Sequence, residues 1–292
     1  MRRLALPAIV LMMLMCAPAP ASAWGFEVHK FIMGRAILLV PPEIRPFFQK
    51  YETTLVEHAI DPDTWRTVGW IEEPPRHFVD MDAYGPYPFR NLPHDYDEAV
   101  KRYGAGFVEK QGTLPWRSEE IYKKLVEAFT QTTPYARDNI KLFASVLTHY
   151  ESDAHQPFHA ALNYDGQLTG QWGIHARFET ELFERYRSQL QLAPALPAPV
   201  TNSREFIFDA LTTSFPLVQP VLDADKAAVQ GRDVYDDAYF DALFRKVKPI
   251  LEKRLSDSIA GAAALITAAW TEAGRPGVPL ENPRTPRPVR RR

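Results

Sequence analysis

The chain has 292 residues with ordinary hydrophobic (46%) and charged (24%) fractions, which allows one large domain or two small ones with a substantial core. Its formal net charge of −2 at pH 7 argues against a protein that binds duplex DNA, because such proteins carry an excess of basic residues. The only cysteine, Cys16, falls in the N-terminal apolar stretch, so any metal site further along must use His, Asp, Glu or backbone atoms. A lipoprotein reading of Cys16 is disfavoured because Met15 stands where a small residue is expected.

The first 23 residues have the form of a signal peptide. Two arginines precede an apolar run from Leu4 to Met15, and Ala21-Ser22-Ala23 has the small-x-small pattern that signal peptidase cuts. We therefore expect cleavage before Trp24 and export to a periplasm or out of the cell. The mature chain would keep 32 basic and 36 acidic residues, a formal charge of −4. No later stretch approaches the roughly 20 apolar residues that a transmembrane helix needs.

Helical patterns dominate the rest of the chain, because apolar residues recur at spacings of three and four and no clear alternating strand pattern occurs. We expect an all-α fold with long irregular loops, built as a single compact multi-helix domain over residues 24–273. Helices are expected at 25–39, 42–58, 117–130, 135–156, 171–190, 203–223 and 234–272. Residues 68–112 are expected to form a long irregular stretch and 193–199 a loop. The Pro- and Arg-rich tail, 274–292, is expected to be disordered.

The segment from Thr148 to His159 carries the clearest chemistry. On a helix, His149 and Asp153 project from the same face one turn apart, so both can reach one divalent ion. Pro157 has no N–H to donate, so the helix should end or kink there and let His159 turn toward the same centre.

A second pair, His175 and Glu179, repeats the four-residue spacing on the next expected helix. A single pair of this kind is more often a solvated ion pair or a capped core histidine. Two pairs together with His159 fall within 31 residues, in a mature chain without thiols. This combination predicts a metal site.

These residues resemble, in order, the marks of a known superfamily: the zinc-dependent phospholipases C of bacteria and the single-strand-specific nucleases of plants and fungi. The marks are a mature N-terminal Trp, a nearby His, an Asp, a His-Phe-x-Asp segment, a His-x3-Asp-x5-His segment and a His-x3-acid segment. The match spans residues 24–179, and the corresponding residues are Trp24, His29, Asp63, His77, His149, Asp153, His159, His175 and Glu179.

The resemblance implies three zinc ions per chain with nitrogen and oxygen ligands only. The first ion would take Asp63, His77, His149 and one oxygen of Asp153. The second would take His159, His175 and Glu179. The third would take the amino group and carbonyl of Trp24, His29 and the other oxygen of Asp153. The role of Trp24 requires cleavage before it, which is where the signal-peptide pattern independently locates the cut.

For two of these metal ligands, Asp63 and Trp24, an alternative interpretation remains. Asp61 could replace Asp63, but the position three before Arg66 fits the nuclease pattern better. Trp24 could be only the first aromatic residue of the core. The remaining histidines are interpreted as surface groups or as groups behind the ligands: His58, His94 and His155.

The implied activity is hydrolysis of phosphodiester bonds. Zinc lowers the pKa of water toward about 7 and offsets the charge that builds on the phosphate oxygens. We expect a water shared by two zinc ions, or activated beside Asp63, to attack phosphorus, with Asp63 and Asp153 as the catalytic residues.

The sequence allows two classes of substrate, a phospholipid and a single-stranded nucleic acid. Glu179 in place of Asp favours the phospholipases, as does Glu27 at mature position four, where those enzymes use an acid against the choline cation. The Trp24-Gly25 start and the run from Asp153 to Pro157 resemble the nucleases. Glu27 could equally be an exposed carboxylate that favours a helix N-terminus.

Phe78 and nearby aromatic residues could hold an unstacked base, contact lipid or fill the core. We prefer a phospholipase C-like enzyme that makes transient contact with a membrane surface. The alternatives are a single-strand-specific endonuclease or 3′-nucleotidase and, less favoured, a helical zinc-binding protein without turnover. We expect a monomer.

Overall fold

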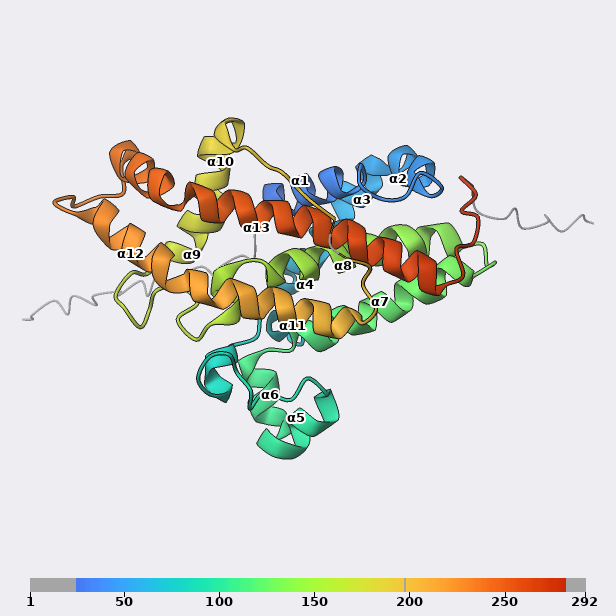
Figure 1. Cartoon of the computed structure of the whole chain (residues 1–292), viewed down its shortest axis with the longest axis horizontal. Coiled ribbons are helices and arrows are strands. Elements are labelled where there is room, and N and C mark those ends of the chain that lie inside the picture. The colour runs from blue at the N-terminus through green and yellow to red at the C-terminus, as the bar shows by residue number, and fades with distance from the viewer. Residues whose placement is uncertain (1–24, 197, 282–292) are drawn as a thin grey trace, which may run out of the picture.

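The structure is a computed structural model of the chain, and it describes residues 25–196 and 198–281 (Figure 1). Within these ranges all regular structure is helical and no strand occurs, so the expected all-α class is confirmed. No helix in this part of the chain is long and apolar enough to cross a membrane. The expected signal peptide, Trp24 and most of the expected tail lie outside the described residues.

The N-terminal region forms four short helices: α1 (Phe26–Ala36), α2 (Arg45–Lys50), α3 (Glu52–His58) and α4 (Asp61–Thr67). The single helix expected at 42–58 is interrupted at Tyr51, which separates α2 from α3. The expected end at residue 58 is confirmed, because α3 ends at His58; a further helix, α4, then begins at Asp61 with Pro62 in its first turn. At that position a missing N–H removes no intrahelical hydrogen bond.

The stretch 68–112 is more regular than its composition predicts. It contains two short 3-10 turns, η1 (Pro74–His77) and η2 (Met81–Tyr84), followed by α5 (Tyr96–Tyr103) and α6 (Ala105–Gln111). Asp95 caps α5 by accepting a hydrogen bond from the Glu98 N–H at 3.0 Å. Gly104, at a φ of 85°, then separates α5 from α6. The expectation of a wholly irregular stretch is therefore wrong for its second half.

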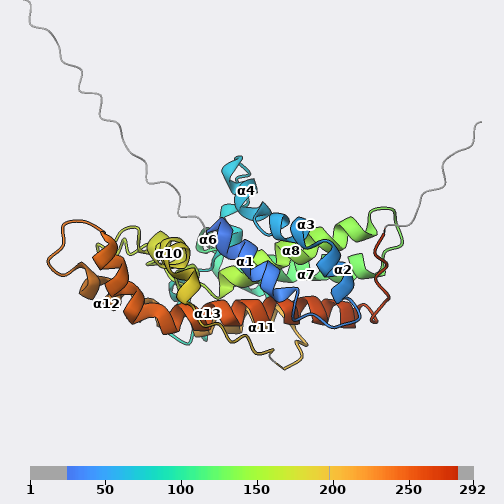
Figure 2. The same cartoon turned by 90° about the horizontal axis from the view of Figure 1, so that it is seen from above.

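Five longer helices build the body of the molecule: α7 (Leu114–Thr130), α8 (Ala136–Ala154), α11 (Ser203–Ser214), α12 (Val218–Val229) and α13 (Asp237–Glu272). The helix expected at 203–223 is divided by η6 (Phe215–Leu217), where Pro216 has no N–H for the ladder. In Figure 1, α13 runs along most of the length of the molecule. Figure 2 shows α1 and α8 lying along it, and both helices pack on α13.

The helix expected at 171–190 is a chain of short elements. It consists of α9 (Ile174–Ala176), a π-helical turn η4 (Arg177–Glu181), α10 (Leu182–Tyr186) and the 3-10 turn η5 (Arg187–Gln189). Single π-turns inside helices are frequent at functional sites. This one includes Glu179, one of the expected metal ligands.

The apolar core has two parts that share α1 and α13. One part gathers around α7, α8 and α11, and the other around α10, α12 and the first half of α13. Residues of α1 enter both parts, with Met33 in the first and Ile32 in the second. Between them, α8 presents a run of buried polar side chains, from Thr148 to Asp153, that apolar packing does not explain.

One close approach between helices gives a test of this packing. A Cβ added to Gly261 of α13 would lie 1.9 Å from Oε1 of the fully buried Glu151 on α8. We expect Gly261→Ala to lower the free energy of unfolding by about 1–3 kcal/mol, because an overpacked core must shift. The matched control is Gly106→Ala in α6, where an added Cβ meets nothing within 4 Å. Urea denaturation should show the control unchanged or slightly stabilised; equal effects of both substitutions would contradict the packing described.

Candidate metal centre

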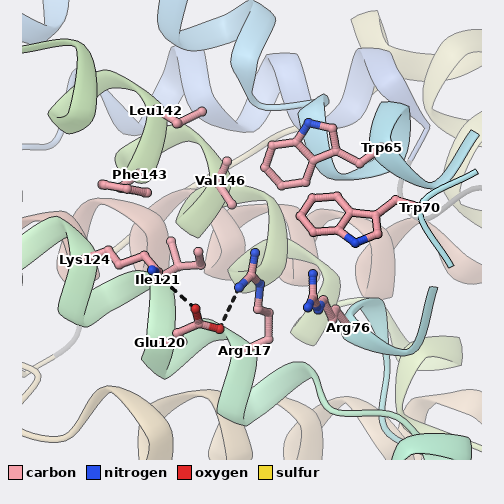
Figure 3. A pocket seen from close by; sticks show the side chains of 10 residues that line it. All are labelled: Trp65, Trp70, Arg76, Arg117, Glu120, Ile121, Lys124, Leu142, Phe143 and Val146. Carbon is pink, nitrogen blue, oxygen red and sulfur yellow. Dashed lines mark hydrogen bonds and ion pairs between the residues drawn. The ribbon is translucent and has the colours of Figure 1, made fainter. Parts of the chain in front are cut away.

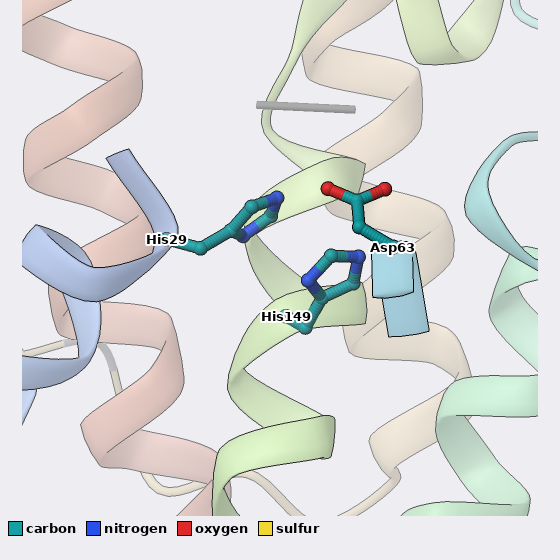
Figure 4. A group of neighbouring side chains, drawn as sticks. All are labelled: His29, Asp63 and His149. Carbon is teal, nitrogen blue, oxygen red and sulfur yellow. The ribbon is translucent and has the colours of Figure 1, made fainter. Parts of the chain in front are cut away.

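Five histidines and three carboxylates converge in the interior. Their ligand-capable atoms form three groups, each within 4.8 Å: His29, Asp63 and His149; His77, His149 and Asp153; and His159, His175 and Glu179. Figure 4 shows the first group, in which the Asp63 carboxylate faces the two imidazole rings. All eight side chains are at most 4% exposed. These are the eight described residues among the nine that the sequence singles out.

Asp153 joins two sets of imidazoles through different oxygens. Its Oδ2 lies 3.1 Å from His77 Nδ1 and 3.4 Å from His149 Nε2. Its Oδ1 lies 3.5 Å from Nε2 of His29, which comes from α1. The four-residue spacing on α8 therefore brings His149 and Asp153 to one face, and segments far apart in sequence complete the arrangement.

The third group depends on how α8 ends. The helix stops at Ala154, and Pro157 begins a 3-10 turn, η3 (Pro157–Ala160), that carries His159. His159 Nε2 lies 3.1 Å from His175 Nε2, which in turn lies 2.9 Å from Glu179 Oε2. Gln156, which sequence reasoning did not single out, donates from Nε2 to Glu179 Oε2 at 2.9 Å.

Groups behind the imidazoles fix which ring nitrogen faces inward. Backbone carbonyls accept from the Nδ1–H of three histidines: Ala59 from His149 at 2.8 Å, His77 from His159 at 2.6 Å and Tyr164 from His175 at 2.8 Å. Because a carbonyl only accepts, the Nε2 lone pair of each ring is directed at the cluster. Histidine ligands in metalloproteins are oriented in this way.

The other two histidines follow the same arrangement with side chains. The hydroxyl of Ser152 donates to the His149 carbonyl, so its oxygen accepts from His29 Nδ1 at 2.8 Å. His77 turns Nδ1 inward, while its Nε2 lies 3.6 Å from Glu73 Oε1. Glu73 and Ser152 are fully buried, but in the sequence they carry no spacing signal.

The donor atoms fit a bound cation. His159 and His175 direct two Nε2 atoms at each other across 3.1 Å while both Nδ1 atoms donate to carbonyls. Ligands at about 2.0–2.1 Å from a tetrahedral zinc lie roughly 3.3 Å apart. Within the described residues, His29 Nε2, Asp153 Oδ1 and Glu179 Oε1 are buried without a hydrogen-bond partner. Nitrogen and oxygen donors without thiolates suit catalytic zinc.

Burial shifts the carboxylates toward their neutral form. It raises the pKa of Asp153 to about 7, although contact with His77 partly opposes this shift. It also raises the pKa of Glu179, against the opposing effect of His175. A nearby cation stabilises the charged form of a buried carboxylate and lowers its pKa. The raised pKa values of Asp153 and Glu179 therefore indicate that the surrounding side chains do not fully balance their negative charge.

Burial also keeps most of the imidazoles neutral. It lowers the pKa of His29, His149 and His159 well below the ordinary value, with help from neighbouring positive groups. These rings therefore hold a free lone pair at neutral pH, as a metal ligand must. His77 differs: burial lowers its pKa, but the carboxylates of Asp153 and Glu73 outweigh this and raise it to about 9.

Several residues weighed in the sequence lie outside the three groups. Asp61 contacts His58 Nδ1 at 2.7 Å instead of joining the cluster. Glu27 is an exposed carboxylate 4.0 Å from Lys30 in the first turns of α1, and Phe78 packs against Gly112. Neither side chain joins the three groups.

The histidines outside the groups have their own partners. His94 is half-exposed beside Glu205, and its ring stacks on Phe208. His155 is buried next to Glu151, so reading it as a surface group is wrong. His155 directly follows the last residue of α8, and its Nε2 lies 3.0 Å from Glu151 Oε1.

Comparison with known proteins identifies a shared fold. The sequence matches no protein-family model and no curated protein. Among solved structures, the chain is similar to the alpha-toxin of Clostridium perfringens, isolated from avian strain SWCP, with 15% identity and a TM-score of 0.53. The alignment covers 87% of this chain and 65% of that one. At this identity the likeness shows the fold alone, and it supports the all-α fold that the sequence resemblance implies.

The donor atoms of the three groups suit a bound metal ion, and metal content tests the third group. We expect His175→Asn to bind less zinc per chain than the wild type, because His159 and Glu179 would lose the ligand between them. His94→Asn is the matched control, since His94 pairs with Glu205 outside the cluster. Elemental analysis of both purified variants should show loss in the first only. Unchanged zinc in His175→Asn would exclude this group as a site.

Proposed function

We propose that this protein is an exported zinc-dependent phosphodiesterase of the phospholipase C type. The observation that supports it most is the buried Asp153 carboxylate, whose two oxygens contact imidazoles of different groups. When bound, clustered zinc ions acidify a nearby water molecule and offset the negative charge of a phosphodiester. The side chains around them hold, orient and desolvate the reacting groups.

We assign the ligands as the sequence resemblance implies. Asp63, His77, His149 and Asp153 would hold one ion, and His159, His175 and Glu179 a second. His29, the second Asp153 oxygen and the amino group and carbonyl of Trp24 would hold a third. Gly25, the first described residue, directly precedes α1, which carries His29, and a Cβ added to Gly25 would lie 2.5 Å from Thr180 Oγ1, beside Glu179 in sequence. The residue that follows Trp24 is therefore close to residues next to the candidate ligands, which supports the assignment of Trp24.

Arg66 supplies a positive charge suited to the substrate phosphate. It is on α4, with Nη2 3.1 Å from Asp63 Oδ1, and its side chain is 14% exposed. Burial lowers the pKa of His29 and His149, and the charge of Arg66 adds to this lowering; the same charge opposes the rise that burial causes in the pKa of Glu179. A guanidinium can donate two parallel hydrogen bonds to phosphate oxygens. We assign Arg66 to bind the phosphate, and Asp63 to orient the attacking water.

Exposed apolar side chains around the centre favour a phospholipid. Val68 (77% exposed) and Ile71 (82%) lie on the segment that joins Asp63 to His77. Leu168 (70%) and Trp172 (60%) lie on the segment that joins His159 to His175. Each segment begins and ends at a candidate ligand, so the exposed apolar side chains belong to the loops that connect the ligands. Apolar and aromatic groups of this kind suit transient contact with a membrane surface.

A hollow beside the centre favours the alternative, a single-stranded nucleic acid. It has a volume of about 340 Å³ and includes Trp65 and Trp70, whose ring centroids lie 5.5 Å apart (Figure 3). Such rings can stack on unpaired bases. The arginines in the hollow are already neutralised, however: Arg76 pairs with Glu73 at 2.8 Å and Arg117 with Glu120 at 2.6 Å. We therefore prefer the phospholipid.

The two substrates are separated by assaying one preparation against both. The mature protein beginning at Trp24 is loaded with zinc and incubated with phosphatidylcholine vesicles and, separately, with single-stranded DNA. We expect release of phosphocholine, and Asp153→Asn should lose both zinc and turnover. Cleavage of DNA alone would replace the phospholipase by the nuclease. Bound zinc without hydrolysis of either diester would leave a zinc-binding protein without this activity.

Arg66 provides a second test that does not depend on metal binding. We expect Arg66→Gln to lower kcat/KM about 100-fold, because one donor to the developing phosphate charge is lost. Zinc content should stay as in the wild type, and Arg66→Lys should recover part of the activity through its charge. Arg102→Gln, an exposed change on α5, is the control. Wild-type kcat/KM in Arg66→Gln would remove Arg66 from the proposed site.

A further inference from the structure

A second hollow lies on the side of α1 opposite to His29. Its volume is about 740 Å³, within the range of sites that hold small molecules. It is lined by side chains of α1 and of the turn that follows it, of the segment 187–194, and by Ile259 of α13. Its lining is mixed: Phe31, Leu39, Leu190 and Leu192 supply an apolar part, beside the polar side chains of Arg35, Arg187, Ser188 and Gln191. Figure 2 shows α1 lying between α10 and the middle of α13.

Two arginines give this hollow a positive charge. Arg35 Cζ lies 5.2 Å from the centre of the Phe31 ring, and Arg187 Cζ lies 5.9 Å from the centre of the Phe183 ring. The two rings touch each other edge to face, with centroids 5.2 Å apart. A guanidinium stacked on a ring keeps its in-plane N–H groups available for an anion.

No carboxylate neutralises these arginines within the part of the chain that the structure describes. The lining contains neither Asp nor Glu, and neither Arg35 nor Arg187 forms an ion pair within 4.0 Å there. Glu252 holds the wall from outside the lining: it accepts from the Gln191 N–H at 2.6 Å and pairs with Lys248. The Trp65–Trp70 hollow differs in this respect, since its arginines have acidic partners.

We propose that this hollow binds a single-chain anionic amphiphile, a fatty acid carboxylate, with its chain against the apolar part of the lining and its head group at Arg35 and Arg187. Two guanidiniums without acidic partners complement a carboxylate, and the leucine and phenylalanine side chains of the lining complement an alkyl chain. This site is separate from the candidate metal centre, and the proposal does not rest on the phosphodiesterase activity.

The test uses decanoate as the probe and isothermal titration calorimetry on the zinc-loaded protein. We expect saturable binding with one decanoate per chain, and at least tenfold weaker binding in the Arg35→Gln/Arg187→Gln variant. Ser188→Glu adds a negative charge to the exposed lining and should weaken binding to a similar degree. Ser188→Gln and Arg245→Gln, an exposed change on α13, should bind as the wild type does.

Two outcomes would overturn the proposal. Decan-1-ol that binds as tightly as decanoate would show that the arginines play no part in recognition. Decanoate binding that persists in Arg35→Gln/Arg187→Gln but disappears after chelation of zinc would show a carboxylate at the metal centre instead. Circular dichroism of each variant should match the wild type, which confirms that a loss of affinity does not reflect unfolding.

Discussion

The burial of carboxylates and imidazoles in one small volume is the constraint on which this structure depends. Asp63, Asp153 and Glu179 are fully buried, and five histidines around them are at most 4% exposed. Buried charges are strongly unfavourable unless they are paired or bind metal. Arg66 supplies one positive charge near the centre, with Nη2 3.1 Å from Asp63 Oδ1. Bound cations would complete the charge balance, and their binding would then contribute to the stability of the fold.

The surrounding fold keeps these groups in place from behind. Backbone carbonyls of Ala59, His77 and Tyr164 orient three imidazoles, so the path of the chain itself sets the ligand geometry. The segment with His175 and Glu179 is held from its other side by Arg177. Arg177 Nε donates to the Tyr239 hydroxyl at 2.8 Å, and its Nη2 lies 3.2 Å from Asp225. These contacts tie the ligand-bearing segment to α12 and α13.

The sequence predicts the parts of the site that follow helical spacing. His149 with Asp153 and His175 with Glu179 are each four residues apart, and the structure brings each pair together. Asp63 could be preferred over Asp61 only by resemblance, because both lie in one turn of α4 and the local pattern does not distinguish them. The all-α class follows from the same periodicity, which is strongest in long helices such as α8.

Other features could not be predicted because they depend on contacts between distant segments. Glu73 and Ser152 orient His77 and His29, but neither has a spacing that marks it. The helices α5 and α6 lie in a stretch whose Gly and Pro content indicates loops, and a cap at Asp95 and a turn at Gly104 make them possible. The π-turn around Glu179 likewise has no signal in the sequence, since its residues suit an ordinary helix.

The most direct test of the central claim is anomalous diffraction at the zinc edge from crystals of the mature protein. Our account predicts three anomalous peaks around Asp153 and Glu179, with ligand nitrogen and oxygen atoms at about 2.0–2.2 Å from each. Zinc-soaked crystals with no anomalous peak in this cluster, and with the eight side chains bonded only to one another, would contradict it.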